Sequence, residues 1–248
     1  MNRQKIQSSL LVYLTCFSAL AASDSAEPWG YSGHQGPEHW GELAPEFARC
    51  SSGKNQSPID ISQTTKGDLA KLEANYEVAG EKILNNGHSI QVNYAPGSYV
   101  SLAGQQFELK QFHFHSPSEN TVKGQSFPLE AHFVHADAQG QLAVVALMFT
   151  QGEANKELAK AWAQLPLEAG DKATLTAPVS AAALWPANQD YYRFNGSLTT
   201  PPCSEGVTWL VLKTPVSASK QQIVDFTAVM GHNNNRPVQP LNARLIVE

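Results

Sequence analysis

Short segments with the composition of β-strands recur along this chain, and they constrain its fold more than any other feature of the sequence. The segments are rich in Val, Ile, Leu and aromatic residues, and most are bounded by Gly, Pro or Asn. The expected strands are Lys82–Asn93, Gln106–His115, Phe127–His135, Leu142–Thr150 and Val207–Leu212. A chain with this pattern is expected to form a mostly antiparallel sheet.

Two further segments have the pattern of helices. Glu153–Leu165 carries apolar residues at helical spacing and stops at Pro166. Ser219–Met230 begins with a capping-box pattern and is followed by Gly231. We therefore predict a mainly β (α+β) fold, in which a few short helices lie at the periphery of the sheet.

Length and charge narrow the class of protein. A β-rich chain of 248 residues fits a single domain. Its residues are 42% hydrophobic and 16% charged, which is typical of a globular protein and not of a disordered one. The formal net charge is -5 and no basic run is present, so the sequence disfavours binding to nucleic acid or to anionic membranes.

The N-terminus has the pattern of a secretory signal peptide. Arg3 and Lys5 precede an apolar run, Leu10–Leu20, and small residues suited to cleavage follow. Residues 1–23 are expected to be cleaved, which leaves an exported domain, residues 24–248, without a stable membrane anchor. A buried N-terminal helix or a retained anchor is the alternative interpretation.

Cleavage would also change the cysteine count. Cys16 would leave with the signal peptide, and Cys50 and Cys203 would remain as an even pair in an oxidising compartment. Export favours a disulfide bond between them over two free buried thiols.

Two histidines alternate with two phenylalanines in the segment Gln111–His115. Residues two apart in a strand point to the same side. His113 and His115 are therefore expected to share one face with Gln111, while Phe112 and Phe114 face the apolar layer.

A second expected strand carries another histidine with the same orientation. Glu130, His132 and Val134 share one face, while His135 falls on the opposite face and is interpreted as structural. If the two strands pair, His132 can meet His113 and His115 at one point. The Gln111 carbonyl and the Glu130 carboxylate are placed to accept hydrogen bonds from the ligand ring N–H groups.

Three neutral imidazoles suit a catalytic zinc site. They leave the fourth tetrahedral position open for water, and they leave the full charge of the ion to acidify that water. The remaining histidines have no companions in the sequence, and we interpret them as ordinary polar residues. They are His34, His39 and His232.

Motifs that run in a fixed order from residue 29 to 241 give the chain a resemblance to the α-carbonic anhydrases. The motifs are Trp29-Gly30-Tyr31, Gly36–Trp40, Asn55–Ile61, Asn85–His88, Gln111–His115, Ser118–Val122, Glu130–His135, Ser197–Pro202 and Arg236–Leu241. The resemblance implies a large central twisted sheet, an active site in a cone-like cleft and one Zn²⁺ per chain. It implies reversible hydration of carbon dioxide to bicarbonate and a proton by attack of zinc-bound hydroxide.

The resemblance also assigns roles around the metal. Thr199 matches the threonine that accepts a hydrogen bond from the hydroxide and donates one to Glu119, because an ionised carboxylate can only accept. Thr200 matches a position that contacts bicarbonate. Five residues match the apolar wall against which the substrate rests: Val134, Val144, Leu198, Val207 and Trp209.

A proton shuttle is implied as well. His88 matches the histidine that exports the proton, and a side chain that titrates near neutrality suits this task. Tyr31, Asn86 and Gln91 match positions that order the intervening waters, although Gln91 stands where the best-studied members have Asn.

Other features carry over from the family. The Cys50–Cys203 pair matches the disulfide of exported members, and cis peptide bonds are implied at Ser57–Pro58 and Pro201–Pro202. Phe194 departs from the pattern, because many members have a hydrogen-bonding tyrosine there, and this predicts a slightly looser Thr199 loop. The signal pattern suggests the periplasm of a Gram-negative bacterium, secretion to the medium stays open, and the protein is expected to be a monomer or a homodimer.

Competing interpretations are weaker. His113, His115 and Glu119 fit the first half of a cupin metal motif, but no second motif follows at the right spacing. A binuclear metallo-hydrolase would want an Asp where Pro117 stands. A non-catalytic binding domain of the same fold typically lacks a zinc histidine, and here all three are present. A purely structural zinc is disfavoured because only three ligands converge.

Overall fold

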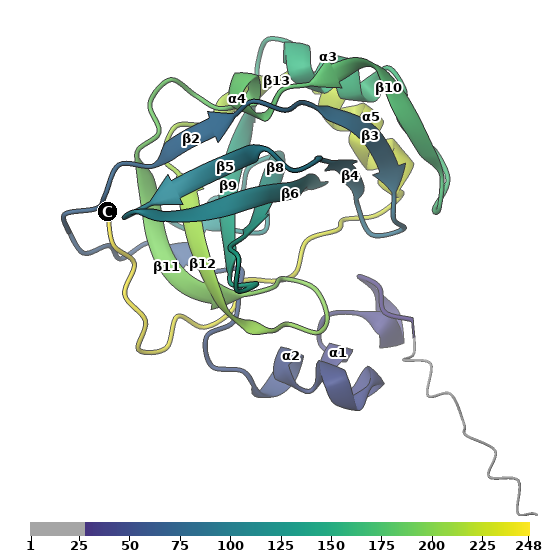
Figure 1. Ribbon diagram of the computed structural model, residues 1–248. Coiled ribbons are helices and arrows are strands. Elements are labelled where there is room, and N and C mark those ends of the chain that lie inside the picture. The colour runs from purple at the N-terminus through teal and green to yellow at the C-terminus, as the bar shows by residue number, and fades with distance from the viewer. Residues whose placement is uncertain (1–27) are drawn as a thin grey trace, which may run out of the picture.

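The computed structural model describes residues 28–248. The expected signal peptide and Cys16 therefore lie outside the described residues. The described part contains one large mixed sheet and a few short helices, as the composition predicts (Figure 1).

The large sheet has eleven strands. They are β2 (Glu73–Tyr76), β3 (Gly80–Asn85), β4 (Ile90–Asn93), β5 (Ser98–Leu102), β6 (Gln105–His115), β8 (Leu129–Ala136), β9 (Leu142–Gln151), β10 (Lys172–Val179), β11 (Tyr191–Ser197), β12 (Glu205–Leu212) and β13 (Val216–Ala218). Neighbouring strands follow the order β10-β3-β4-β6-β8-β9-β12-β11, with β5 also pairing with β6 and β2 with β5. The short strands β1 (Asp60–Ile61) and β7 (Thr121–Val122) form a separate parallel pair.

The sheet is mostly antiparallel, and both of its parallel pairings involve strand β9. Strand β9 pairs in parallel with β12 along its first half and with β13 along its second half. The strands β2, β5, β10, β11 and β13 were not predicted from composition, because charged, polar or glycine residues interrupt their apolar pattern.

One predicted strand is wrong in its extent. The segment Lys82–Asn93 is split into β3 and β4 by a turn that begins at Asn86. The Asn86 side-chain oxygen accepts hydrogen bonds from the backbone N–H groups of His88 (2.9 Å) and Ser89 (2.7 Å), and Gly87 has a positive φ of 85°. An Asn-Gly pair is a strong turn signal, so the sequence contained the information for this break.

The helices are short and lie at the periphery of the fold (Figure 1). They are α1 (Trp40–Leu43), α2 (Arg49–Ser52), α3 (Lys156–Trp162), α4 (Ala181–Leu184) and α5 (Lys220–Met230), with 3-10 turns at Gly33–Gln35 and Pro45–Phe47. Helix α3 is shorter than the predicted Glu153–Leu165, because the Asn155 side chain caps its first turn. Helix α5 is confirmed, with the Ser219–Gln222 capping box and a left-handed Gly231 after its last turn.

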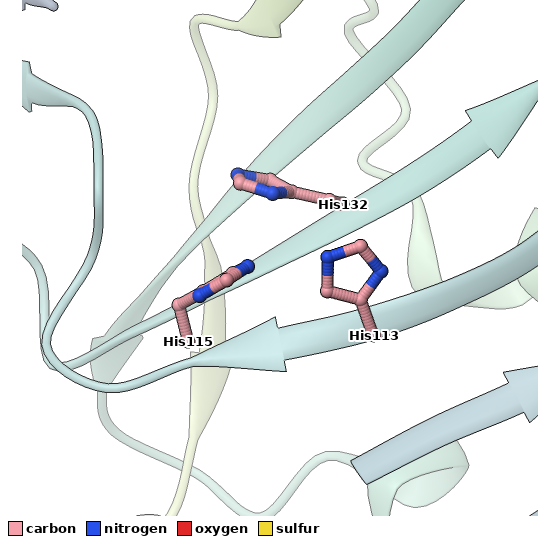
Figure 2. Close-up of side chains that lie close together, drawn as sticks. All are labelled: His113, His115 and His132. Carbon is pink, nitrogen blue, oxygen red and sulfur yellow. The ribbon is translucent and has the colours of Figure 1, made fainter. Parts of the chain in front are cut away.

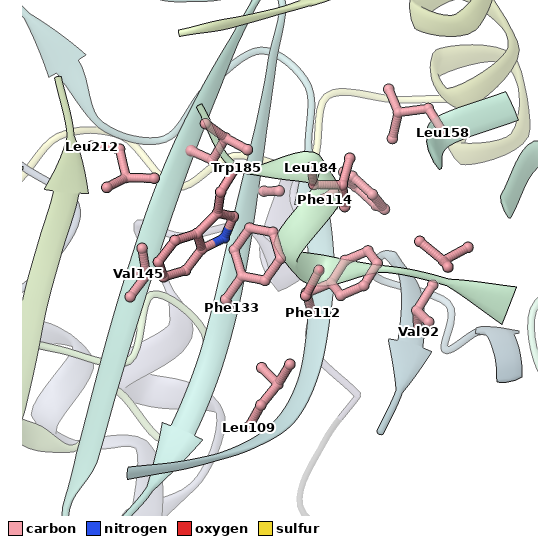
Figure 3. Packing of buried hydrophobic residues seen from close by; sticks show 14 of the residues in the cluster. Val92, Leu109, Phe112, Phe114, Phe133, Val145, Leu158, Leu184, Trp185 and Leu212 are labelled. Atoms are coloured by element: carbon pink, nitrogen blue, oxygen red, sulfur yellow. The ribbon is translucent and has the colours of Figure 1, made fainter. Parts of the chain in front are cut away.

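The main hydrophobic core covers one face of the sheet. Phe112, Phe114 and Phe133 are fully buried there, and Trp185 packs edge-on against Phe133 (Figure 3). Burial of each such ring contributes about 2–3 kcal/mol. The predicted phenylalanine face of the strand that carries the histidines is therefore confirmed, and its opposite face is free for polar chemistry.

The N-terminal segment is joined to the loop after β11 by a disulfide bond. Cys50 and Cys203 form this bond, as expected, and both pack against the buried Trp40. The cis peptide bonds at Ser57–Pro58 and Pro201–Pro202 are also present, together with one at Ser116–Pro117 that was not predicted. Among residues 28–248, no helix is both long and apolar enough to span a membrane.

Candidate metal centre

The predicted pairing of the two histidine strands is present. Strand β6 pairs antiparallel with β8, and His113 lies directly opposite His132. His115 is two residues further along the same face of β6. Figure 2 shows the three imidazoles, from two neighbouring strands, turned toward one another.

The three histidines form a compact donor group. One ring nitrogen from each of His113, His115 and His132 lies within 4.8 Å of the other two. His115 and His132 are each only 1% exposed. Among the described residues, this is the only group of three or more His, Cys, Asp or Glu side chains with such geometry.

Hydrogen bonds to the other ring nitrogens determine which nitrogen can bind a metal. His113 Nδ1 lies 2.9 Å from Gln111 Oε1, and His132 Nε2 lies 2.9 Å from Glu130 Oε1. His115 Nδ1 lies 2.7 Å from the Asn234 carbonyl oxygen. Each of these oxygens accepts, so each of these nitrogens carries the hydrogen. The unprotonated nitrogens are therefore Nε2 of His113, Nε2 of His115 and Nδ1 of His132.

These unprotonated nitrogens fit a zinc ion. His115 Nε2 is buried and, within residues 28–248, has no hydrogen-bond partner. An orphaned acceptor of this kind is costly unless a cation or a donor satisfies it. Burial lowers the pKa of all three imidazoles, which favours the neutral form that a metal requires.

Glu130 connects the metal centre to the loop that carries Glu119. Besides His132, its carboxylate accepts hydrogen bonds from the backbone N–H groups of Glu119 (2.7 Å) and Asn120 (3.0 Å) and from the Asn120 side chain (2.8 Å). Burial raises the pKa of Glu130 to about 6, although these hydrogen bonds oppose the rise. Glu130 thereby fixes the position of the loop that carries Glu119 relative to His132.

Glu119 points into the centre without joining the donor group. Its Oε1 accepts a hydrogen bond from the Arg236 backbone N–H (2.8 Å), and its Oε2 lies 3.5 Å from His115 Nε2. Burial raises the pKa of Glu119 to about 8, and the nearby Arg236 N–H and Thr199 side chain oppose the rise. Within the described chain, Oε2 makes no hydrogen bond that meets normal distance and angle limits.

The five residues assigned to the apolar wall lie in one cluster. This cluster packs on the histidine side of β8, β9 and β12, opposite the main core. Val144, Val207 and Trp209 are buried, and Val134 and Leu198 are partly buried against them. The ring of Trp209 packs edge-on to His132, with 4.9 Å between ring centroids. Phe194, the departure from the family pattern, stacks parallel to Trp209 with 6.0 Å between ring centroids, and the looser Thr199 loop stays a prediction.

A small hollow leads from the histidines to the surface. Its volume is about 150 Å³. It is lined by Trp29, Tyr31, Asn86, His88, Ser89, Gln91, Gln111, His113, His115 and Thr200. The predicted shuttle residue, the predicted water-ordering residues and Thr200 therefore share one cavity with two of the histidines.

His88 stands at the mouth of this hollow. Its imidazole stacks on Trp29, with 3.7 Å between ring centroids and 10° between the ring planes. Burial lowers the pKa of His88, and repulsion from His232 lowers it further. The Tyr31 hydroxyl is buried nearby without a partner among the described residues.

Sequence reasoning missed two contributors to this site. Trp29 was part of a motif, but its stacking on His88 depends on the tertiary fold. Asn234 was not singled out at all, yet its carbonyl group accepts the His115 hydrogen bond. No local pattern marks Asn234, because its partners lie about 120 and 146 positions earlier in the chain.

Comparison with known proteins agrees with this architecture. The family model for eukaryotic-type carbonic anhydrase matches residues 35–248. The chain belongs to the α-carbonic anhydrase family. A carbonic anhydrase from Pectobacterium carotovorum is 52% identical over 237 residues, which cover 96% of each chain. The family resemblance and the enzyme class expected from the motifs are thereby confirmed.

Solved structures of α-carbonic anhydrases have the same fold. The α-carbonic anhydrase from Thermovibrio ammonificans, in complex with the inhibitor sulfanilamide, has a TM-score of 0.88 and 52% identity, with 89% of this chain and 99% of that chain covered. The chain is also similar to more distant proteins. Dioscorin dioA3 from Dioscorea japonica is 33% identical over 96% of this chain and 91% of its own. A structure of dioscorin complexed with ascorbate has a TM-score of 0.83 and 32% identity, covering 89% and 97%.

Proposed function

We propose that this protein catalyses the reversible hydration of carbon dioxide to bicarbonate and a proton, with one zinc ion held by His113, His115 and His132. The convergence of three unprotonated ring nitrogens beside a hollow that His113 and His115 line is the observation that carries this proposal. Zinc in such a site lowers the pKa of a bound water to about 7 and so supplies a nucleophile at neutral pH.

The hydrogen-bond acceptors behind the histidines keep each ring in the tautomer that binds metal. Gln111, Glu130 and the Asn234 carbonyl each hold one N–H group. Because each acceptor is buried or part of the sheet, the three rings are oriented before a metal arrives. This preorganisation supports tight binding and a fixed direction for the open fourth position.

Glu119 and Thr199 are proposed to orient the attacking group. The Glu119 carboxylate is anchored through Oε1, which leaves Oε2 for Thr199. A zinc ion beside Glu119 would oppose the rise in its pKa and favour the ionised form, which can only accept, so the Thr199 hydroxyl must donate to it. The Thr199 oxygen would then accept a hydrogen bond from the nucleophile. This hydrogen bond would direct a lone pair of the nucleophile toward the substrate.

The apolar cluster beside His132 is proposed to hold carbon dioxide. Val134, Val144, Leu198, Val207 and Trp209 offer a nonpolar surface beside the metal position. Transfer of a small nonpolar gas from water to such a surface costs little free energy. Bicarbonate, which is charged, would instead contact Thr200 at the polar side of the hollow.

His88 is proposed to remove the proton. Its ring lies in the wall of the hollow that also contains Tyr31, Asn86 and Gln91. Gln91 is opposite His113 in the β4–β6 register, and its amide donates to Asn93 at 2.6 Å. These polar groups would order water between the metal position and His88, because polar groups too far apart for direct contact can be bridged by water.

Stopped-flow measurement of carbon dioxide hydration by the purified, zinc-loaded protein tests the proposal. We expect turnover far above about 10³ s⁻¹, the rate at which a group of pKa 7 can release a proton to water unaided. Slower but detectable turnover would support the hydration activity and contradict the role of His88 as proton shuttle. No hydration by a folded, zinc-loaded protein would overturn the proposal and favour a binding protein, as the dioscorin relatives suggest.

The shuttle has a test of its own. Replacing His88 by Ala should lower kcat about tenfold or more in weak buffer, and added imidazole should restore it because imidazole replaces the missing proton acceptor. A His34→Ala variant, in which an exposed histidine that does not line the hollow is removed, is the control. Equal kcat values for the two variants in weak buffer would contradict the role of His88.

We also propose that the protein is exported, with residues 1–23 as its cleaved signal peptide and the periplasm as its destination. The signal pattern and the Cys50–Cys203 disulfide support this proposal. Mass spectrometry of the protein recovered from periplasm and from medium tests it. A protein retained in the cytoplasm with an intact N-terminus would contradict it.

A further inference from the structure

A second histidine lies beside Tyr31, one of the residues that line the hollow. His232 is exposed, and its ring centroid is 5.7 Å from that of Tyr31. The His88 ring lies 6.5 Å from the same Tyr31 ring. Tyr31 therefore has one histidine ring on the wall of the hollow and another at the protein surface.

The segment that carries His232 is hydrogen-bonded to the turn that carries His88. The Asn234 side-chain amide donates hydrogen bonds to the His88 carbonyl and to the Phe114 carbonyl, both at 2.9 Å. Its side-chain oxygen accepts from the Ser116 backbone N–H at 2.8 Å. Asn234 is fully buried, so these bonds hold His232 two residues away in a stable position relative to His88.

The hydrogen bonding of His232 leaves one nitrogen ready for a proton. His232 Nδ1 lies 3.0 Å from the Asn233 carbonyl oxygen. The carbonyl can only accept, so Nδ1 carries the hydrogen and Nε2 has the free lone pair. A histidine with a free lone pair, exposed to solvent, can take a proton and give it to a buffer base.

His232 also influences His88 electrostatically. The charge of a protonated His232 lowers the pKa of His88. Protonation of both rings at once is therefore disfavoured, which suits a pair of rings that carries one proton at a time. His88 is half-buried and has one face covered by Trp29, whereas His232 is open to solvent.

We propose that His232 is a second proton relay, which accepts the proton from His88 through water and passes it to buffer. In this step an N–H bond of the His88 imidazolium breaks and an N–H bond forms at His232 Nε2. The buffer base then removes one proton from the His232 imidazolium, and both rings return to the neutral state. This inference rests on the proposed function, because it extends the path that begins at His88.

Stopped-flow kinetics of the zinc-loaded His232→Ala variant tests the relay. We expect kcat in weak buffer to fall about threefold, the size of effect that a neighbouring charge produces at an exposed site. Imidazole should restore kcat, while kcat/KM should change little because proton export follows the hydration step. The His34→Ala variant is the control, since His34 is also exposed but its ring neighbours that of His39 instead of Tyr31.

A double variant separates a relay in series from an independent path. If His232 receives its proton from His88, then His232→Ala should have no further effect in a His88→Ala background. A threefold loss that persists in that background, or no loss in the single variant, would overturn the proposal. Wild-type protein without hydration activity would instead reveal failure of the proposed function.

A measurement that needs no turnover checks the coupling directly. NMR titration of the imidazole signals should show that the pKa of His88 rises when His232 is replaced by Ala, because the repulsion is removed. An unchanged pKa of His88 would show that the two rings do not interact electrostatically, and this result would contradict the proposed relay.

Discussion

His132 and His135 lie on the same strand, β8, three residues apart, but on opposite faces of the sheet. Both are fully buried, and burial lowers the pKa of both. His135 has a partner on each nitrogen, since Nε2 lies 2.8 Å from the Tyr76 hydroxyl and Nδ1 lies 3.2 Å from the Ala143 carbonyl oxygen. His132 has a protein hydrogen-bond acceptor on Nε2 only, and its Nδ1 faces two other histidines.

The comparison shows that burial alone does not make a metal site. A buried histidine with both nitrogens satisfied is stable as it is, whereas one with a free lone pair needs a further partner. The paired strand decides which case applies, because β6 brings two more histidines to one face of β8 and phenylalanines to the other.

The largest difference is expected in metal binding. His132→Ala should abolish zinc retention and lower carbon dioxide hydration by at least about a thousandfold, because the metal supplies the nucleophile. His135→Gln should retain both zinc and activity. Zinc content by metal analysis and stopped-flow rates check this. Full zinc retention and activity in His132→Ala would contradict the ligand assignment.

A smaller effect is expected in the pH dependence of stability. The pKa of His135 is about 4 in the folded protein and about 6.5 when unfolded, so the unfolded chain binds more protons between these values. Stability should therefore fall as the pH falls from above 6.5 to about 4, with a contribution from His135 of up to about 3 kcal/mol.

His135→Gln should remove this contribution, because glutamine keeps a donor and an acceptor but does not titrate. Urea unfolding of the two zinc-loaded proteins at several pH values compares them under equal conditions. Parallel stability curves for the variant and the wild type would show that His135 is not the titrating group.

A third prediction concerns the acceptor behind His132. Glu130→Gln should weaken zinc affinity about 10- to 100-fold, the usual cost of losing a carboxylate partner of a metal-binding histidine. Competition with a chelator measures the affinity. Glutamine has nearly the same side-chain volume as glutamate, so the variant is expected to fold. Its unfolding midpoint verifies this. An unchanged zinc affinity would show that Glu130 serves the loop at Glu119 and not the ligand.

The smallest effect is expected on the other face of β8. Tyr76→Phe removes the hydroxyl that donates to His135 Nε2 and should lower the free energy of unfolding by about 1 kcal/mol, without loss of zinc or activity. Chemical denaturation measures it. A loss of zinc in this variant would show that the two faces are coupled, against the separation described above.

Alternation within the chain predicted much of the site. The Gln111–His115 and Glu130–His135 segments each have a period of two, and this period alone assigned His113, His115 and His132 to one face and His135 to the other. The disulfide partners followed from the cysteine count once export was assumed. These predictions succeeded because the direction of a side chain in a strand is a local property.

Other contributors depended on contacts between distant segments. The acceptor for His115 is a backbone carbonyl of Asn234, and every residue carries such a group, so no residue type marks it. The parallel pairing of β9 with β12 and β13 likewise leaves no local signature. The Asn86–Gly87 turn was a different case, because its signal was present and the apolar residues on either side obscured it.

The sequence by itself determined which residues share a face, where two of the helices lie and which histidines have the chemistry of zinc ligands. Only the tertiary structure decided the partner of each ring nitrogen, the stacking of Trp29 on His88 and the position of His232 beside Tyr31. The physical reason is range: side-chain alternation follows from the geometry of one strand, whereas hydrogen-bond partners and ring contacts arise where segments far apart in the chain meet.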